Sequence, residues 1–552
     1  MLIDSLVGET YYKAMKLEFD PIAKEFPLSR FPVYGKKGMV ASSSPEAATA
    51  ASKVMYQGGN AIDAAVAAAA ALTVVEPTCN GIGSDAFALV WSKGKLHGLN
   101  ASGPAPKLIS LEKVKQRGHN QMPTYGWEAV TVPGAPAAWA ELNKRFGSKT
   151  LTEVMAPAIE LAYNGFAISA NLSTLWQQEL AIYKRVLNSA MYKPWFETFT
   201  VDGKAPACGH LWRSSDHGDT LALIAETNAQ AFYSGKLADR IDAFSRQHEG
   251  FLRLEDLAAF TPEWVEPIST SYRGFDVWEI PPNGQGLSAL LALNILESLG
   301  EFDRFDERAV HTLIEATKLA MSDGGHYITD PKYMGLSSET LLSKSYAAQR
   351  AAQIGEKAAL PEPGTPSKGG TVYVATADDQ GNMVSYIQSN YMAFGSALVV
   401  PHTGIALQNR GANFSLDPEH INCLAGGKRT FHTIIPGFLS AKGTPIGPFG
   451  VMGGFNQPQG HVQLLTNTID QKLNPQAALD APRWRWTQKK QVLVEPSFPS
   501  SMVESLRKRG HQVVVSADQE MFGRGQIIWY DNTNKTFVGG TESRTDSVIT
   551  LA

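Results

Sequence analysis

A threonine that follows two glycines at the start of a strand-like run constrains this chain more than any other feature. Residues 369–375 read Gly-Gly-Thr-Val-Tyr-Val-Ala, directly after a Pro- and Gly-rich segment at 360–369. In mid-chain the hydroxyl of Thr371 has no base beside it, but cleavage of the Gly370–Thr371 bond would supply an α-amino group that can take its proton. Gly370 lacks a Cβ and allows the strained backbone that self-cleavage needs. Thr371 is therefore either the first residue of a strand, for which threonine is well suited, or a nucleophile made by cleavage.

The composition describes an ordinary globular chain. It has 552 residues, 43% of them hydrophobic, and a net charge of −4 with no long block of one sign. This argues against a dedicated nucleic-acid or membrane-surface protein. Acidic and basic residues between Asp4 and Asp20 leave no apolar signal-peptide core, and the apolar run at 61–75 is too short to span a bilayer. We expect a cytoplasmic protein.

The three cysteines, Cys79, Cys208 and Cys423, are widely spaced and odd in number. They form neither a metal-ligand pattern nor a disulfide framework. His311-x-x-x-Glu315 has helical spacing without the HExxH arrangement, so we interpret it as a surface or core pair. The loop at 281–286 lacks the GK[ST] ending of a phosphate loop. No metal site is predicted.

Periodicity and turn signals predict three regions. Residues 39–100 predict a strand at 39–41, followed by a helix capped by the Ser43-to-Glu46 pattern. An alanine-rich helix is predicted at 61–75, whose small side chains let neighbouring elements pack closely on both sides. Paired strands follow at 87–91 and 96–100. The middle, about 151–355, is predicted to be mostly helical, with helices at 151–163, 221–225, 287–299 and 309–321. After Thr371 strands dominate, at 372–377, 383–388, 405–408, 491–494, 512–516 and 525–530, with helices at 462–470 and 475–481.

Several ordered motifs together resemble the γ-glutamyltranspeptidase family of N-terminal-nucleophile hydrolases. They are Gly38-Met-Val-Ala, the segments 58–65 and 80–87, Asp256-Leu-Ala-Ala-Phe and the Thr371 segment. The resemblance runs from about Gly38 to the C-terminus. It implies an αββα sandwich made as a precursor and cut into a large subunit, 1–370 with an extension at 1–37, and a small subunit, 371–552. A further dimer of these heterodimers is left open.

Carried over residue by residue, the resemblance gives Thr371 the role of nucleophile. Ser389 stands where a second hydroxyl hydrogen-bonds to the amine or hydroxyl of the nucleophile. Gly453 and Gly454 stand where a glycine pair supplies the oxyanion hole, whose donors must come within about 3 Å of the oxygen. Nucleophile, base and oxyanion donors would then all be protein groups, so no cofactor is implied.

The departures from the family pattern lie in the substrate pocket. Ser102 replaces the arginine that holds the α-carboxylate of a γ-glutamyl group. Arg410 and Asn413 replace the two acids that hold its α-ammonium. His432 and Thr433 replace the paired serines that help bind the α-carboxylate.

A guanidinium repels an ammonium but matches a carboxylate with two hydrogen bonds. We therefore expect an amidohydrolase for a small amide whose acyl group carries a carboxylate, of the oxamate or glutaryl type. Three alternatives stay open at this point: a γ-glutamyl hydrolase or transpeptidase that uses other residues, a non-catalytic scaffold on the same fold, and structural roles for Arg410 in a salt bridge and for His432 in packing.

Overall fold

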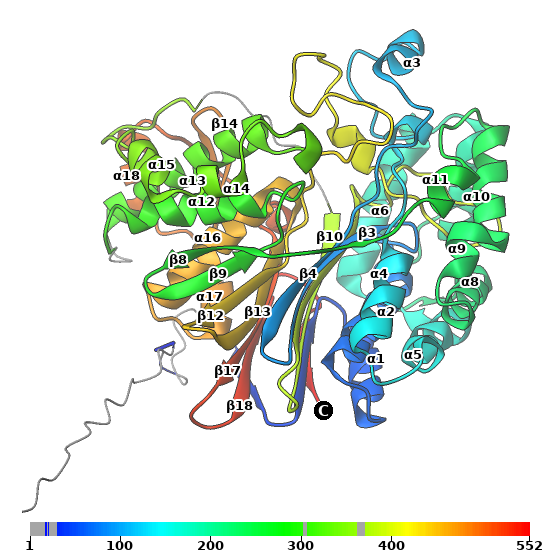
Figure 1. The fold of residues 1–552 in the computed structure, drawn as a ribbon, viewed down its shortest axis with the longest axis horizontal. Coiled ribbons are helices and arrows are strands. Elements are labelled where there is room, and N and C mark those ends of the chain that lie inside the picture. Colours follow the sequence, from blue (N-terminus) through cyan, green and yellow to red (C-terminus); the bar gives the residue numbers. More distant parts are fainter. Residues whose placement is uncertain (1–16, 19, 21–29, 302–305, 362–369) are drawn as a thin grey trace, which may run out of the picture.

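Two antiparallel seven-stranded sheets form the centre of the molecule (Figure 1). The structure is a computed structural model that describes residues 17, 18, 20, 30–301, 306–361 and 370–552. In spatial order, sheet A consists of β1 (Val33–Gly35), β18 (Thr536–Thr541), β17 (Arg524–Asp531), β13 (Thr444–Met452), β12 (Gly437–Ala441), β9 (Phe275–Glu279) and β8 (Ile268–Tyr272). Sheet B consists of β19 (Val548–Leu551), β2 (Gly38–Ser42), β10 (Gly370–Asp378), β11 (Met383–Tyr391), β3 (Asp85–Ser92), β4 (Lys95–Ala101) and β7 (Glu263–Val265).

The two sheets pack face to face, with β10 and β11 against β13, and β2 against β17 and β18. Helices cover the outer face of each sheet, as the two sides of Figure 1 show. The sheet B side carries α1 (Pro45–Tyr56), α2 (Ala61–Val75), α4 (Ala135–Phe146), α5 (Leu151–Asn164), α6 (Ala170–Val186), α7 (Lys193–Phe199), α8 (Ser215–Glu226), α9 (Gln230–Ser234), α10 (Lys236–Gln247) and α11 (Leu254–Ala258). The sheet A side carries α12 (Gly286–Glu297), α13 (Glu307–Tyr327), α14 (Ser338–Leu341), α15 (Lys344–Ala351), α16 (Gln457–Ile469), α17 (Pro475–Asp480) and α18 (Ser500–Lys508).

Smaller elements complete the fold. Helix α3 (Leu111–Gln116) projects at the top of Figure 1, β14 (Trp484–Gln488), β15 (Gln491–Val494) and β16 (Gln512–Val515) form a three-stranded sheet, and β5 (Phe166–Ala167) pairs with β6 (Leu211–Trp212). Short 3₁₀ turns lie at Trp127–Ala129, Ala190–Tyr192, Pro331–Tyr333, Arg410–Asn413, Gly454–Asn456 and Gln519–Phe522.

Helix α2 is buried along its whole length, between sheet B and the helices α1 and α5. Its alanines let these neighbours approach closely, as the sequence predicts. The side chain of Asn60 caps the first turn of α2, and the backbone amide of Asn60 in turn donates to Asp63 Oδ2 (3.1 Å). The amide of Ala61 donates to Asp378 Oδ2 (2.7 Å), which ties the helix to the end of β10.

Both sheets combine strands from before and after Thr371. Sheet B places β10 and β11 between β2 and β3, and sheet A places β12 and β13 beside β8 and β9. The predicted hairpin of β10 and β11 and the pair of β3 and β4 are confirmed. The expected boundary at 370/371 therefore does not separate two independent sheets.

Three expectations of secondary structure are corrected. The cap of α1 is Ser44, because Pro45 takes the first helical position; Ser43 instead donates to Glu76 Oε2 (2.5 Å). Residues 405–408 form isolated bridges to Gly83 and Val399 rather than a strand. The middle region also contains the strands β7, β8 and β9 at 263–279, which are short, have a mixed pattern and give little sequence signal; β7 and β8 lie at sheet edges, whereas β9 lies between β8 and β12.

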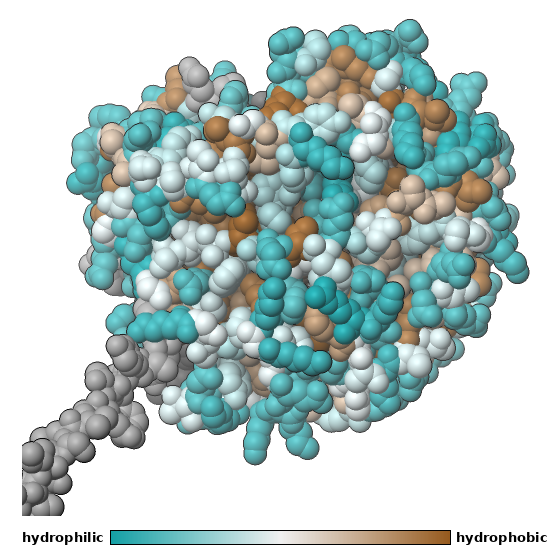
Figure 2. All heavy atoms as spheres, viewed as in Figure 1, coloured by the Kyte–Doolittle hydropathy of each residue, from teal (hydrophilic) through white to brown (hydrophobic). Residues whose placement is uncertain are grey.

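The face drawn in Figure 2 is largely hydrophilic, with hydrophobic side chains in small groups. This is the ordinary surface of a folded protein, in which scattered apolar residues need no partner. Among the described residues, no helix has both the length and the apolar character needed to cross a bilayer.

Candidate active site

Thr371 lies at the start of β10, where the pairing with β11 is irregular. Gly370 pairs with Tyr391 and Val372 pairs with Gln388, so two residues of β11 oppose Thr371 alone. Such a bulge locally re-aims the side chains beside it and is common next to active sites. Thr371 is 1% exposed.

Two side chains contact the hydroxyl of Thr371. Thr371 Oγ1 lies 3.2 Å from Ser389 Oγ, and Gln457 Nε2 donates to it at 3.4 Å. Ser389 Oγ also accepts from the amide of Tyr391 (2.7 Å), and Gln457 Oε1 accepts from the amide of Ile435 (2.9 Å), so both side chains are held in place. The structure brings together the predicted pair and adds Gln457, which the sequence analysis missed. Its only sequence signal is its position three residues after Gly454.

The predicted oxyanion glycines connect β13 to α16. Gly453 has φ +142° and Gly454 has φ +60°, which are backbone conformations that favour glycine. They precede the first turn of α16, where backbone N–H groups have no helical acceptor and favour negative charge. Gln285 Nε2 donates to the carbonyl of Gly454 (2.9 Å) and fixes this turn. The oxyanion role of this glycine pair stays a prediction.

Arg410 is buried and forms a bidentate ion pair with Asp85. Its Nε lies 2.8 Å from Asp85 Oδ2 and its Nη2 lies 3.1 Å from Asp85 Oδ1. Its Nη1 donates to Thr433 Oγ1 (2.7 Å), and its Cζ lies 4.6 Å from the ring centre of Tyr391. The salt bridge that the sequence left open for Arg410 is therefore present, and Asp85 is the second residue that the sequence analysis missed.

His432 belongs to the same cluster. Its Nε2 lies 2.7 Å from Asp85 Oδ2, and its Nδ1 accepts from the amide of Ile434 (3.3 Å). Burial, together with the nearby charge of Arg410, lowers the pKa of His432 to about 4. The ring is thus neutral near pH 7, with a proton on Nε2 that it donates to Asp85.

Asp85 stays ionised despite being fully buried. Burial alone would raise its pKa, but Arg410 and His432 outweigh that effect and hold the pKa at about 2. The cluster therefore contains one guanidinium, one carboxylate and one neutral imidazole.

Ser102 and Asn413 are not bound to Arg410 in the structure. Ser102 Oγ donates to Asn100 Oδ1 (2.7 Å) and lies within 3.3 Å of Asn283, whose carbonyl accepts from the amide of His432 (2.9 Å). Asn413 Nδ2 donates to the carbonyl of Phe431 (3.1 Å). Both residues border the cluster through the segment that carries His432.

Comparison with known proteins places the chain in a family. The model of the γ-glutamyltranspeptidase family matches residues 47–552. The chain belongs to the γ-glutamyltranspeptidase family. It is accordingly an enzyme, a hydrolase of the N-terminal-nucleophile type.

The similar proteins include hydrolases and acylases that are made as proenzymes. The glutathione hydrolase-like YwrD proenzyme of Bacillus subtilis (strain 168) is 37% identical over 526 residues, covering 93% of this chain and 98% of the relative. The oxamate amidohydrolase proenzyme of Klebsiella pneumoniae is 34% identical over 510 residues, covering 90% and 95%. A crystal structure of cephalosporin acylase from Bacillus halodurans superposes with a TM-score of 0.93 at 57% identity, covering 97% and 99%.

A cleft of about 310 Å³ borders the turn at Gly453. Its lining includes Met452, Gly453, Arg485 and Arg524, together with acidic and apolar side chains of α6 and of residues 518–521. Arg524 pairs with Met452 across β17 and β13, which places this arginine beside the turn. The lining of the cleft combines apolar side chains with both acidic and basic ones.

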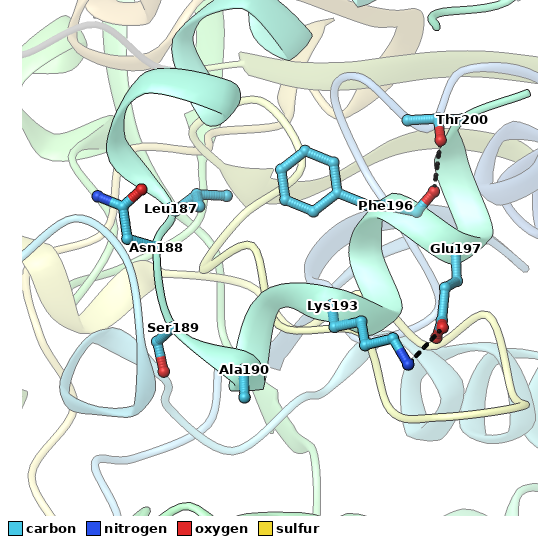
Figure 3. A pocket seen from close by; sticks show the side chains of 8 residues that line it. All are labelled: Leu187, Asn188, Ser189, Ala190, Lys193, Phe196, Glu197 and Thr200. Carbon is cyan, nitrogen blue, oxygen red and sulfur yellow. Dashed lines mark hydrogen bonds and ion pairs between the residues drawn. The ribbon is translucent and has the colours of Figure 1, made fainter. Parts of the chain in front are cut away.

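A second cavity lies apart from these residues. Figure 3 shows it between the end of α6 and α7; its volume is about 590 Å³ and its lining includes Leu187, Phe196 and the ion pair of Lys193 with Glu197 (3.2 Å). None of the site residues lines it. Volume alone therefore does not locate the active site.

His311 and Glu315 belong to a buried polar cluster with His511. His311 Nδ1 lies 2.8 Å from His511 Nε2, and Lys318 Nζ lies 2.6 Å from Glu315 Oε1. In the described part of the chain this is the only close group of three side chains with metal-ligand chemistry. Because Lys318 already neutralises Glu315, a divalent cation there would be an unbalanced buried charge. The cluster instead holds Ala359, whose amide donates to Glu315 (3.1 Å).

Proposed function

We propose that the protein is a self-processing amidohydrolase that cleaves a small amide whose acyl group carries a carboxylate, of the oxamate or glutaryl type. The observation that carries the proposal is the placement of Thr371 at the start of β10, with its hydroxyl between Ser389 (3.2 Å) and Gln457 (3.4 Å). An ordinary first residue of a strand needs no such partners. The family membership supports the same role.

Self-cleavage would use the uncut chain as its substrate. Thr371 Oγ1 attacks the carbonyl carbon of Gly370, the C–N bond breaks, and the nitrogen takes up a proton. Water then hydrolyses the resulting ester, which releases the carboxylate of Gly370 and leaves Thr371 with a free α-amine. The large subunit would be residues 1–370 and the small subunit 371–552, held together as a heterodimer within one αββα sandwich.

Turnover would use the same atoms. The α-amine of Thr371 takes the hydroxyl proton as Oγ1 attacks the substrate carbonyl. The amides of Gly453 and Gly454 stabilise the oxyanion. The C–N bond then breaks, the α-ammonium protonates the leaving amine, and water hydrolyses the threonyl ester.

The acyl group would be bound at Arg410, with Thr433 and His432 beside it and Asn413 and Ser102 at the border. A γ-glutamyl group has an α-ammonium that needs an acidic partner. In the cluster around Arg410, the acid is Asp85, and its two oxygens already accept from Arg410 and His432. The name of the oxamate relative supports an acyl group without that ammonium.

The second candidate is a γ-glutamyl hydrolase or transpeptidase acting on glutathione and γ-glutamyl amides. It is favoured by the name of the Bacillus subtilis relative, which is called glutathione hydrolase-like. A non-catalytic scaffold is disfavoured by the contacts of Thr371. Two further expectations stay predictions. One is that the protein is cytoplasmic, and the other is that it binds neither nucleic acid nor membranes.

The test is a screen of amide hydrolysis by the purified protein. Oxamate, succinamate, glutaryl-anilide and γ-glutamyl-anilide are compared, with Thr371→Ala as the inactive control. The proposal expects turnover of a carboxylated acyl amide to exceed that of γ-glutamyl-anilide. Release of glutamate from glutathione as the main activity would establish the second candidate instead.

A further inference from the structure

The cleft beside Gly453 contains a buried cation that the proposed mechanism does not use. Arg485, on β14, lines this cleft and is 4% exposed. Its Nη1 donates to the carbonyl of Met521 (2.9 Å) and lies 3.8 Å from the sulfur of the same residue. Among the described residues, no acid forms a hydrogen bond with Arg485. A buried charge is ordinarily paired, so this guanidinium has capacity for a further partner.

One edge of the Arg485 guanidinium is open to the cleft. Of its nitrogens, Nε and Nη2 have no acceptor in the described part of the chain, and of these two only Nε is enclosed by protein. Nη2 is therefore the atom that can meet a ligand in the cleft that the residue lines. Burial lowers the pKa of Arg485 to about 10, which the charge of Asp518 offsets only in part, so the group is still a cation at neutral pH.

The second arginine of the lining is already neutralised. Arg524 Nη2 lies 2.6 Å from Glu520 Oε1, and its Nη1 lies 3.6 Å from Glu76 Oε1. The lining also contains Asp518, which is exposed, and Glu179, which is half-buried. An anion deep in the cleft would therefore meet one arginine that has acidic partners and one that has none hydrogen-bonded to it.

The rest of the lining favours a ligand with an apolar body. The apolar and aromatic side chains of the cleft are those of Tyr125, Leu175, Ile182, Met392 and Met452. Apolar walls with one placed cation suit an apolar or aromatic molecule that carries a carboxylate. Since a water-sized molecule takes up about 30 Å³, ammonia would leave most of this cleft of about 310 Å³ empty.

The cleft meets the proposed catalytic site only at the glycine turn. Gly453 belongs to its lining, whereas Arg410, Asp85 and His432 do not. Under the proposed function, the scissile carbonyl lies at Gly453 and the acyl group extends to Arg410. The half of the amide that remains for the cleft is the amine.

We propose that this cleft is the subsite for the leaving amine, in which Arg485 binds a carboxylate carried by an apolar or aromatic amine. This inference rests on the proposed function and deepens it, because it names the class of leaving group. It favours amides of carboxylated amines over oxamate, whose hydrolysis releases ammonia.

The experiment uses two substrates that differ by one carboxylate on the amine. Glutaryl-4-aminobenzoate and glutaryl-anilide share the acyl group and form the same threonyl ester, so the hydrolysis of that ester is common to both. The parent should have the higher kcat/KM for glutaryl-4-aminobenzoate. Arg485→Gln should lower the ratio of the two kcat/KM values by roughly 10- to 100-fold, because it removes a charge-assisted hydrogen bond to one substrate alone.

Two further variants control for folding and for charge. Arg485→Lys keeps the cation but loses Nη2, and it should lower the same ratio by a smaller factor; it also serves should Arg485→Gln fail to process. The matched control is Arg483→Lys, which alters a second buried arginine that is bound to Glu542 (2.9 Å) and is not part of the lining. It should leave the ratio unchanged.

An unchanged ratio in Arg485→Gln, or an equal loss on both substrates, would overturn the proposal. The second result would make Arg485 either structural or a contact of the acyl group. Calorimetry with 4-aminobenzoate and aniline separates this inference from the proposed function. If the parent cleaves neither amide, the proposed function fails, while binding of 4-aminobenzoate that Arg485→Gln weakens would still support the subsite. Absence of binding by the parent, or equal binding by the variant, would refute it.

Discussion

Ser389 and Asp85 face each other across β11 and β3, so the contact to the nucleophile and the anchor of Arg410 lie on one pair of strands. Ser389 points its hydroxyl to Thr371 at 3.2 Å, whereas Asp85 binds Arg410 at 2.8 and 3.1 Å. Under the proposed function, we expect processing to depend on the first contact and substrate choice on the second. Substitutions should therefore separate the two functions.

Removal of the nucleophile should abolish both reactions. Thr371→Ala should stay a single folded chain of 59.8 kDa, because self-cleavage and turnover use the same hydroxyl. The parent should give two bands of about 40 and 20 kDa, in proportion to 370 and 182 of the 552 residues, and the small fragment should begin Thr-Val-Tyr-Val by Edman sequencing. Thr376→Ala, which alters a buried threonine of the same strand, should still be processed. A different N-terminus would refute the assignment of nucleophile and base together.

Loss of the donor to Thr371 should slow turnover. Gln457→Glu keeps the oxygen that accepts from the amide of Ile435 but loses the N–H that donates to Thr371. Loss of one such bond in a buried site corresponds to about 1–3 kcal/mol, or roughly 5- to 150-fold in kcat. The added negative charge should also move the acidic limb of the pH–rate profile to higher pH, because it stabilises the α-ammonium. An unchanged kcat and profile would show that Gln457 only packs.

Replacement of Arg410 should affect binding and stability at once. Arg410→Gln should reduce kcat/KM for carboxylated acyl amides by roughly 30- to 1000-fold, or about 2–4 kcal/mol, mostly through KM. It should also lower the melting temperature, since it leaves Asp85 as a buried unpaired charge, a loss of about 3–5 kcal/mol. Self-cleavage should survive.

The double variant Arg410→Gln/Asp85→Asn separates these two effects. It removes both charges and should recover much of the stability but none of the preference for carboxylated acyl groups. Equal losses of Arg410→Gln on charged and neutral substrates would show that Arg410 is only structural.

Substitution of the oxyanion turn should harm catalysis more than binding. Gly453→Ala places a Cβ at φ +142° and 3.2 Å from the Cα of Gly523, so the turn must shift. Loss of one oxyanion donor lowers kcat by roughly 100- to 1000-fold. A kcat lowered by this factor with an unchanged KM is the expected readout, and self-cleavage should slow in parallel. A normal kcat would show that the oxyanion hole is formed by other residues than Gly453.

Stability should fall in mild acid because several buried histidines are neutral, among them His432, His217 and His511. Burial lowers the pKa of His432 and of His217 to about 4. Between the unfolded value near 6.5 and pH 4, the unfolded chain binds protons that the folded chain does not, so the free energy of unfolding decreases as pH falls. The slope is about 1.4 kcal/mol per pH unit for each histidine. Denaturant unfolding from pH 7 to 5 measures it, and His217→Asn should remove one histidine's share.

The sequence by itself predicted most of the local elements and proposed Thr371 as the nucleophile. Helix α2, for example, follows from the alanine run, Asn60 and the stop before Pro77, and β10 and β11 follow from alternating apolar residues around one turn. The motifs named Thr371, Ser389, Gly453 and Gly454 as a set. The structure places the hydroxyl of Ser389 beside that of Thr371 and gives the glycine pair positive φ values.

Only the tertiary structure decided what Arg410 contacts. Asp85 precedes Arg410 by 325 residues, and Gln457 follows Thr371 by 86. Contacts over such separations leave no periodic pattern in the sequence from which they could be predicted. A buried guanidinium needs an anion, but composition offers 53 acidic residues and cannot say which one meets it. The register of the strands decides which acid is near, because the pairing of β3 with β11 places Asp85 opposite Ser389, beside Thr371.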